Sequence, residues 1–168
     1  MSEQMEPRDL LARLDELGIA SRTIEHAPAF TVEDGEAAMG HLPGVHIKNL
    51  FLCDAKKVMW LVTVPWNRVV DLKQLPAVIG AARLSFGSAD RLQRVLGVTP
   101  GSVTPFAVIN DTAHQVNVIL DAWMMSQEII NAHPLINSMT TSLKSADLMK
   151  FFAATGHKPR LVNLGDAP

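Results

Sequence analysis

Lys48 is the first residue whose surroundings suggest chemistry, because it interrupts a strongly apolar stretch. It lies in the segment VHIKNLFLCD, residues 45–54. An unpaired ammonium group buried in such surroundings costs free energy. Lys48 therefore either points to solvent from a half-exposed strand or projects into a pocket, where it meets a negative or carbonyl group of a ligand.

The segment PGSVTPF, residues 100–106, is the second candidate. Glycine and proline around small residues can expose consecutive backbone N–H groups, and such groups bind a carbonyl oxygen or an oxyanion. The alternative is a tight turn that leads into an apolar strand. Both interpretations stay open at this point.

His133 is the third candidate, in the segment NAHPLINSMTTSL, residues 131–143. Pro134 favours a turn directly after it. A histidine can hydrogen-bond a substrate or act as a general base near neutral pH. The segment is therefore either a structural turn before a strand or part of a cleft for a polar substrate.

Other common kinds of site have no support in the sequence. The six histidines lack the spacing of a helical zinc motif, and the one cysteine excludes a CxxC pair. No nucleophile elbow, P-loop or dinucleotide fingerprint is present. We predict no metal site and no cofactor, and we interpret Cys53 as a small buried apolar residue.

Composition indicates one globular domain over residues 1–168, with 48% hydrophobic and 19% charged residues. The net charge of −2 argues against a protein that coats nucleic acid through many phosphates, but allows contact with a nucleic-acid end. Basic residues gather in two regions, which solvated surface also explains. They are Arg83, Arg91 and Arg94 in the first, and Lys144, Lys150, His157, Lys158 and Arg160 in the second.

The sequence also indicates a compartment. No apolar run is long enough to span a membrane, and the polar N-terminus, MSEQMEPRDL, is unlike a signal peptide. A single cysteine cannot form an intramolecular disulfide. We therefore predict a cytoplasmic protein with no membrane partner.

Hydrophobic periodicity and capping residues predict an α+β fold with more strands than helices. Helices are expected at Pro7–Leu17, at 32–40 after a Thr31 cap, at 88–97 and at Ser145–Thr155 with Ser145 as cap. The segment 71–80 is a further helix candidate, but Pro76 is unfavourable within a helix. Strands are expected at Ser21–His26, His46–Asp54, Lys57–Pro65, after Phe106, at 116–124, 128–134 and 138–144, and in the tail. The second and third of these strands are expected to form a hairpin.

Three segments occur in an order that resembles a known family. HIKNLFL comes first, then GSVTPF, then HPL followed by NSMTTSL. In this order they resemble the YbaK-like family, the editing domain associated with prolyl-tRNA synthetase, and most of all its free-standing branch that removes alanine from mischarged proline tRNA. The resemblance extends from residues 31–40 to the segment GHKP at the end of the last helix. It implies a curved, mixed, mainly antiparallel and barrel-like sheet surrounded by helices.

The resemblance also implies a site. The family's essential lysine corresponds to Lys48, and Asn49 stands beside it. Its glycine-containing loop corresponds to Gly101–Pro105, and its His-Pro-Leu segment to residues 133–135. The implied catalytic residues are Lys48, His133 and Gly101. The implied substrate-binding residues are Asn49, Ser102, Val103, Thr104, Pro105, Phe106, Pro134 and Leu135.

The implied reaction is hydrolysis of the ester between a wrong amino acid and the 3′ end of tRNA. Such an ester is already activated, so no covalent nucleophile is needed. We expect loop amides to hold the carbonyl, Lys48 to orient the tRNA end, and water to attack with help from the terminal ribose hydroxyl. His133 lines the pocket, and a tight pocket admits alanine and excludes proline.

The expected partners are the acceptor end of tRNA(Pro) and, in addition, prolyl-tRNA synthetase. Contacts with acceptor-stem phosphates are expected from Lys144, Lys150, Lys158 and Arg160. Two alternatives stay open: a deacylase for cysteinyl-, seryl- or threonyl-tRNA, and a non-catalytic aminoacyl-tRNA or synthetase-binding module of the same fold. Val103 and Thr104 stand where other branches carry different small residues, which leaves the preferred amino acid open.

Overall fold

The computed structural model describes residues 4–168, so the first three residues of the predicted domain 1–168 lie outside the described range. The helices are α1 (Pro7–Glu16), α2 (Val32–Met39), α3 (Leu75–Ile79), α4 (Ala89–Leu96), α5 (Ala122–Met125) and α6 (Ser145–Thr155), with 3-10 helices η1 (Pro100–Ser102) and η2 (Pro105–Asn110). The strands are β1 (Ser21–Glu25), β2 (Val45–Asp54), β3 (Met59–Pro65), β4 (Leu84–Phe86), β5 (Val116–Asp121), β6 (Ile129–Ala132), β7 (Met139–Lys144) and β8 (Arg160–Val162).

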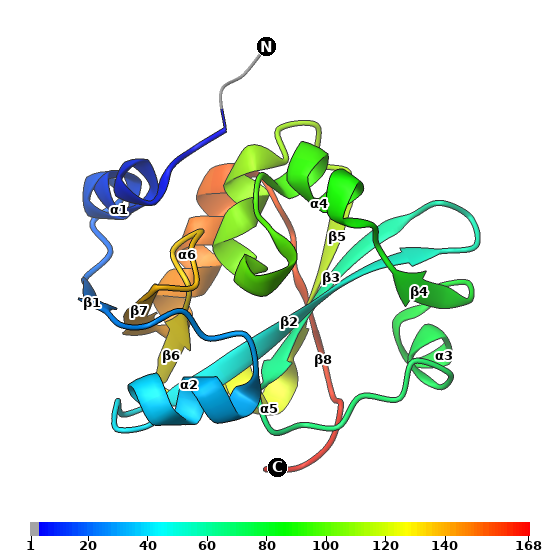
Figure 1. Cartoon of the computed structure of the whole chain (residues 1–168). Coiled ribbons are helices and arrows are strands. Elements are labelled where there is room, and N and C mark those ends of the chain that lie inside the picture. The colour runs from blue at the N-terminus through cyan, green and yellow to red at the C-terminus, as the bar shows by residue number, and fades with distance from the viewer. Residues whose placement is uncertain (1–3) are drawn as a thin grey trace.

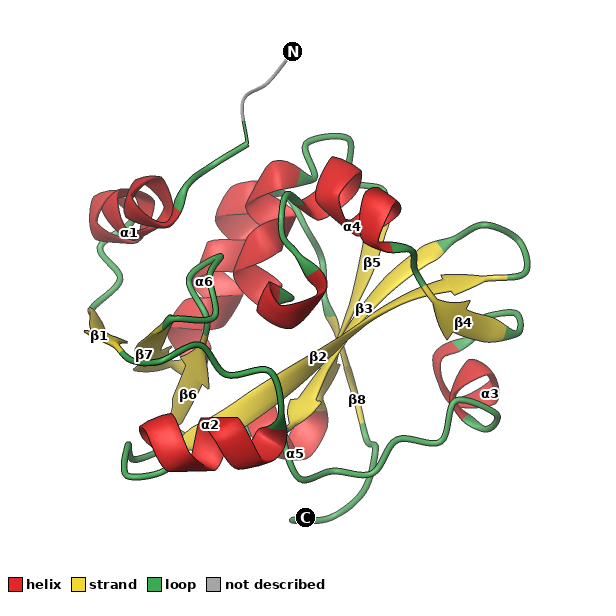
Figure 2. Cartoon of the chain, viewed as in Figure 1, coloured by secondary structure: helices red, strands yellow, loops and turns green. Residues whose placement is uncertain are grey.

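A mixed sheet connects all the strands, as Figure 1 and Figure 2 show. The strand order is β1-β7-β6-β2-β3-β5-β8, and β4 pairs with β2 outside this path. Pairing is antiparallel in β1–β7, β6–β7, β2–β3 and β2–β4, and parallel in β2–β6, β3–β5 and β5–β8. The predicted α+β class, a mixed sheet flanked by helices, is confirmed.

Strand β2 has an open edge in its middle. Along one edge β3 pairs with β2 from Ile47 to Cys53. On the other edge β6 pairs only with Val45 and His46, and β4 pairs only from Leu52 to Asp54. Figure 1 shows β6 and β4 at opposite ends of β2. Within the described chain, residues 47–50 therefore have no strand partner on this edge, and the sheet has a gap there.

Alternate residues of β2 and β3 enter two separate apolar cores, because successive side chains of a strand point to opposite faces. Phe51, Cys53 and Leu61 join the core formed with α1, α4, η2 and α6. Leu52 and Val62 join the smaller core that includes Leu75 and Ile79 of α3. Cys53 is buried, as predicted. Both cores hold β2 firmly in the centre of the molecule.

The helices around the gap begin and end where the sequence predicts. Thr31 caps α2 by accepting a hydrogen bond from the Asp34 N–H, and Ser88 caps α4 by accepting one from the Arg91 N–H. Gly97 ends α4 with a φ of 70°, which glycine adopts without steric cost. These ends direct the chain from α4 into the loop 97–104, opposite α2.

Some predicted elements are wrong. The strand expected after Phe106 is the 3-10 helix η2, which begins at Pro105 and is capped by the Thr104 side chain. The strand expected at 116–124 ends at Asp121, whose carboxylate accepts the Met124 N–H and starts α5. Ser145 is the first residue of α6 rather than its cap, and its hydroxyl donates to the Gln127 carbonyl.

Candidate active site

A cavity of about 370 Å³ lies along the open edge of β2. Because it borders an edge and not one face of the sheet, consecutive residues of β2 line it. The opposite walls come from the segment before α2, from α2 itself, from Trp66 after β3, from the loop after α4, and from His133 after β6. The lining residues are Ala29, Phe30, Thr31, Val32, Gly35, Met39, Ile47, Lys48, Asn49, Trp66, Pro100, Gly101, Val103 and His133. The structure thus brings Lys48, Asn49, Gly101, Val103 and His133 together from three distant segments.

Lys48 has no carboxylate partner at this cavity. None of the ion pairs found in residues 4–168 includes it. Burial lowers the pKa of its ammonium group below the ordinary value of 10.5, because desolvation disfavours the charged form. A bound anion would reverse this effect, so the site is suited to a negative or partly negative ligand group.

Asn49 connects β2 to the loop after α4. Its Nδ2 donates to the Val103 carbonyl at 3.0 Å, and its Oδ1 accepts the Thr63 hydroxyl of β3 at 2.6 Å. Thr63 is fully buried, so both strands of the hairpin fix the carboxamide. The side chain of Asn49 therefore holds the loop beside Lys48.

The loop after α4 contributes Gly101 and Val103 to the cavity wall. The Ser102 N–H is occupied, because it donates to the Thr99 carbonyl. The N–H groups of Gly101 and Val103 have no acceptor within residues 4–168, and both residues line the cavity. Two unpaired main-chain donors therefore belong to residues of the cavity wall.

His133 enters the cavity from a tight turn. Its Nδ1 lies 2.8 Å from the Met139 carbonyl. A carbonyl only accepts, so Nδ1 carries the proton and Nε2 of the neutral ring is a free acceptor. Burial lowers the pKa of His133 below 6.5 more strongly than the Met139 hydrogen bond raises it, and the nearby His26 and His46 lower it further. At neutral pH the ring is uncharged.

A much smaller hollow of about 20 Å³ adjoins the cavity. The two share Met39, Ile47, Asn49, Trp66 and His133 as walls. The remaining walls of this annex are His46, Asn131, Ala132 and Thr140. A volume of this size holds about one water-sized group. The annex therefore has room for only a very small group.

The other predicted substrate-binding residues lie behind the cavity wall. Ser102, Thr104, Pro105 and Phe106 are buried, and Phe106 packs edge-to-face on Phe151 with ring centroids 5.3 Å apart. Pro134 and Leu135 are buried as well, and Leu135 has a φ of 70° in the turn that closes on the His133 carbonyl. None of these six residues lines the cavity or the annex, so they support the site from outside.

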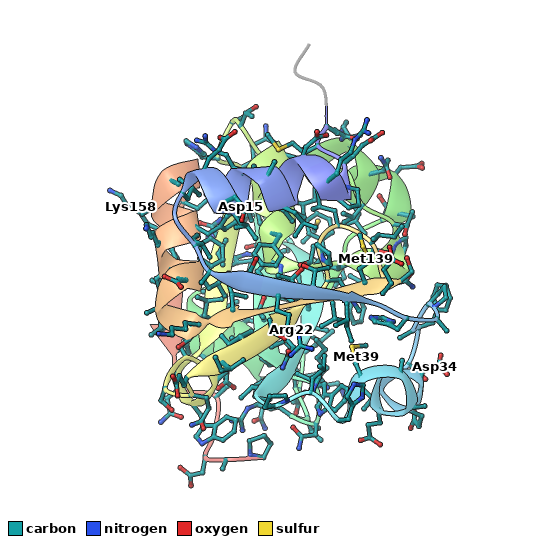
Figure 3. All side chains as sticks on the ribbon, turned by 90° about the vertical axis from the view of Figure 1, so that its left-hand side faces the viewer. Asp15, Arg22, Asp34, Met39, Met139 and Lys158 are labelled. Atoms are coloured by element: carbon teal, nitrogen blue, oxygen red, sulfur yellow. The ribbon has the colours of Figure 1, made fainter. Side chains whose placement is uncertain are left out.

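The predicted tRNA-contact residues do not join the cavity. Lys144 lies at the end of β7 away from Met139, and Lys150 lies on α6. In Figure 3, Lys158 is on the side of the molecule opposite Met39 of α2. The Arg160 guanidinium donates to the Ile79 carbonyl and lies 6.0 Å from the Trp60 ring, which gives it a structural role.

The sequence did not reveal several residues that line the site. Met39 and Thr140 touch in the annex, with the hydroxyl 2.8 Å from the sulfur, and the rings of His46 and Trp66 stack at 4.4 Å. Phe30 lies at the mouth of the cavity. The chemical types of these residues are ordinary for a core, so only their position in space identifies them.

Two further observations concern residues 4–168. No group of three or more His, Cys, Asp or Glu side chains in this range is arranged to hold a metal ion. No helix in it has both the length and the apolar character that crossing a membrane requires.

Comparison with known proteins identifies the family of the chain. Residues 26–151 match the model of the aminoacyl-tRNA editing domain. The prolyl-tRNA editing protein ProX of Acetoanaerobium sticklandii is 39% identical over 156 residues, which cover 92% of this chain and 95% of that protein. The prolyl-tRNA synthetase associated domain-containing protein 1 of Danio rerio is 37% identical over 163 residues, which cover 94% of this chain and 89% of that protein.

Solved structures share the fold. A protein described as a candidate trans-editing enzyme for prolyl-tRNA synthetase superposes with a TM-score of 0.68 at 18% identity, over 98% of this chain and 100% of that one. The chain belongs to the aminoacyl-tRNA editing domain family. The family predicted from the order of the three motifs is confirmed, together with the enzyme class, an aminoacyl-tRNA deacylase.

Proposed function

We propose that this protein is a trans-acting editing hydrolase that removes alanine from mischarged tRNA(Pro). The observation that carries the proposal is the convergence of Lys48, His133 and two unoccupied loop amides on one cavity with a one-group annex. We infer the tRNA substrate from the names of the relatives, because ProX is a prolyl-tRNA editing protein.

The loop binds the ester carbonyl. The Gly101 and Val103 N–H groups donate to the carbonyl oxygen and stabilise the negative charge that develops on it as water attacks. Removing one such donor from an oxyanion hole typically slows an enzyme by about 10²–10³-fold. The Asn49 bridge to the Val103 carbonyl keeps these donors in place before the substrate arrives.

Lys48 and His133 orient the reacting groups. Lys48 places its positive charge beside the tRNA 3′ end and the developing oxyanion. The free Nε2 of His133 accepts a hydrogen bond from the attacking water or from the substrate amine. The water oxygen forms a bond with the carbonyl carbon, and the bond from that carbon to the ribose oxygen breaks. The proton lost by water passes, through the neighbouring ribose hydroxyl, to the leaving oxygen, which yields free alanine and uncharged tRNA.

Alanine selectivity follows from the size of the annex. One methyl group fits a space for about one water-sized group. The proline ring needs room for three methylenes, and Met39, Trp66 and Thr140 block that room. One extra methylene in a rigid pocket typically changes specificity by about 10–200-fold. Correctly charged prolyl-tRNA is therefore spared.

The proposal also includes contacts with the body of the tRNA and with the synthetase. The acceptor end enters the cavity, and Lys144, Lys150 and Lys158 contact more distant phosphates of the tRNA. Arg160 is not included, because its guanidinium donates to the Ile79 carbonyl. The small number of phosphates fits the net charge of −2 and implies a modest salt dependence. The name of the Danio rerio relative, a prolyl-tRNA synthetase associated domain-containing protein, supports docking on prolyl-tRNA synthetase.

A panel of mischarged tRNA(Pro) substrates tests the reaction and its selectivity. We expect fast release of alanine, slower release of serine and cysteine, still slower release of threonine, and no release of proline above the spontaneous rate. Preferred release of serine, cysteine or threonine would instead identify the alternative deacylase. Binding of the charged tRNA without release of any amino acid would identify a non-catalytic binding module.

The variant Lys48→Ala tests the site. We expect kcat/KM for alanyl-tRNA(Pro) to fall by about 10²-fold or more, because a charge that stabilises the transition state is lost. The matched control is Lys56→Ala, at an exposed turn distant from the cavity, which should keep wild-type activity. Circular dichroism and thermal unfolding show that both variants fold. Full activity of the folded Lys48→Ala protein would remove Lys48 from the mechanism.

A further inference from the structure

An aromatic side chain stands open to solvent at the mouth of the cavity. Phe30 lines the cavity and is 72% exposed, although phenylalanine is among the residues most often buried. Phe86 of β4 is the other strongly exposed phenylalanine among the described residues, at 64%, and it does not line the cavity. The exposure of Phe30 therefore coincides with the proposed active site.

The backbone around Phe30 is fixed on both sides. The Phe30 N–H donates to the Asp34 carboxylate at 3.2 Å. The preceding residue, Ala29, exchanges two hydrogen bonds with Asn137, one to its carbonyl and one from its side-chain amide. The exposed ring is thus carried by a well-anchored segment between β1 and α2.

The ring rests on the loop that holds the proposed carbonyl donors. A Cβ atom added to Gly101 would lie 2.8 Å from Cδ1 and 2.9 Å from Cε1 of Phe30. A side chain at position 101 would displace the ring from this position. The ring is therefore adjacent to the point where the ester carbonyl binds in the proposed function, and most of its surface is exposed.

We propose that Phe30 is the stacking platform for the terminal adenine of the tRNA 3′ end. This inference rests on the proposed function and extends it to a nucleobase subsite. The ester carbonyl and the adenine are attached to the same ribose, so a carbonyl on the Gly101 amide places the base near the neighbouring ring. Aromatic side chains bind unpaired bases of RNA by such stacking.

The surroundings favour a base over other parts of the substrate. Phe30 does not line the annex, so it does not select the amino acid. The Asp34 carboxylate beside it repels phosphate, which argues against a backbone contact at this point. Once the amino acid and the phosphates are excluded, the ring is left to contact an uncharged, flat group of the substrate. The terminal adenine is such a group.

Two substrates and a set of variants test the platform. One substrate is alanyl-tRNA(Pro), and the other is the same charged tRNA with an abasic terminal nucleotide. For Phe30→Ala we expect KM on the complete substrate to rise about tenfold or more, because base stacking of this kind is lost. Phe30→Tyr should stay close to the wild type, and the matched control Phe86→Ala should be unchanged. On the abasic substrate, wild type and Phe30→Ala should have equal KM values.

The outcomes separate this inference from the proposed function. An unchanged KM for Phe30→Ala on the complete substrate would overturn the platform, and so would an equal loss on both substrates. If the wild type hydrolyses no mischarged tRNA, the proposed hydrolase fails, and the affinities of uncharged tRNA(Pro) with and without its terminal adenine still test the ring. Circular dichroism checks folding, and Phe30→Leu replaces Phe30→Ala if the latter is unfolded.

Discussion

Burial affects Lys48 and His133 in the same direction but with different consequences. Desolvation lowers the pKa of both groups, because both are cationic when protonated. For His133 the ordinary value of 6.5 is close to neutrality, so a lower pKa yields an uncharged ring with a free Nε2. In the proposed mechanism, Lys48 thus supplies the cation and His133 the hydrogen-bond acceptor.

The pH dependence of deacylation follows from the neutral state of His133. As pH falls below 6.5, activity should persist until the pH reaches the lowered pKa of His133, and then decline as Nε2 is protonated. The variant His133→Gln should be slower and should lack this acidic decline. His114 does not line the cavity, so the control variant His114→Asn should keep the wild-type pH profile. An unaltered profile in His133→Gln would assign the decline to another group.

The same pKa shift contributes to stability. The native state binds the proton of His133 less readily than the unfolded chain, so this stabilising contribution is complete above pH 6.5. It is lost as pH falls through the lowered pKa. Thermal unfolding of wild type and His133→Gln between about pH 8 and about pH 5 measures the effect.

Residue types alone could identify only part of the site. Lys48 stood out because a cation among apolar residues is unusual, and His133 because it precedes a proline turn. Met39, Trp66 and Phe30 gave no such signal, since sulfur and aromatic side chains are ordinary core material. Their roles depend on the gap beside β2, which forms only after strands from distant parts of the chain have paired.

At the scale of elements, the loop after α4 depends on the hairpin beneath it. The hydroxyl of Thr63 on β3 fixes Asn49 on β2, and Asn49 holds the Val103 carbonyl. The relay spans two strands and a loop through side chains that are buried or half-buried. In the proposed mechanism, the position of the loop donors therefore depends on a buried threonine that does not line the cavity.

The variant Thr63→Val tests this relay. Valine has nearly the same shape but cannot donate to Asn49, so we expect a stability loss of about 1–2 kcal/mol. Because the loop donors shift, kcat on alanyl-tRNA(Pro) should fall by about tenfold or more. Thr23→Val is the matched control, since it breaks a hydroxyl pair with Thr141 between β1 and β7 without touching the loop. Equal kcat values in the two variants would show that the relay does not support catalysis.

Two elements show where local patterns mislead. The apolar residues after Pro105 have the composition of a strand, but Pro100 and Pro105 each start a short 3-10 helix, and these turns keep the loop compact. The segment after β5 is also apolar, yet Asp121 caps α5 with one carboxylate oxygen. The residues after Pro105 are mostly buried, whereas only Met124 is buried in α5, and in both places capping groups decided the conformation.

At the scale of the whole molecule, a buried ion pair joins the C-terminal tail to the sheet. Arg68 Nε lies 2.5 Å from the Asp121 carboxylate, and both side chains are almost completely inaccessible to solvent. The same guanidinium donates to the carbonyls of Gly165 and Asp166. This cluster lies after β3 and at the end of β5, apart from the cavity, so its role is to hold the tail on the fold.

The variant Arg68→Met separates stability from activity. It leaves the Asp121 carboxylate buried without its partner, so we expect the free energy of unfolding to fall by about 3–5 kcal/mol. Arg13→Met is the matched control, because Arg13 pairs with Glu16 at the surface of α1, where such a pair contributes about 0–1 kcal/mol. Denaturant unfolding measures both changes. At a temperature where both variants are folded, their kcat on alanyl-tRNA(Pro) should equal that of the wild type, and a selective loss in Arg68→Met would mean that the tail also positions the site.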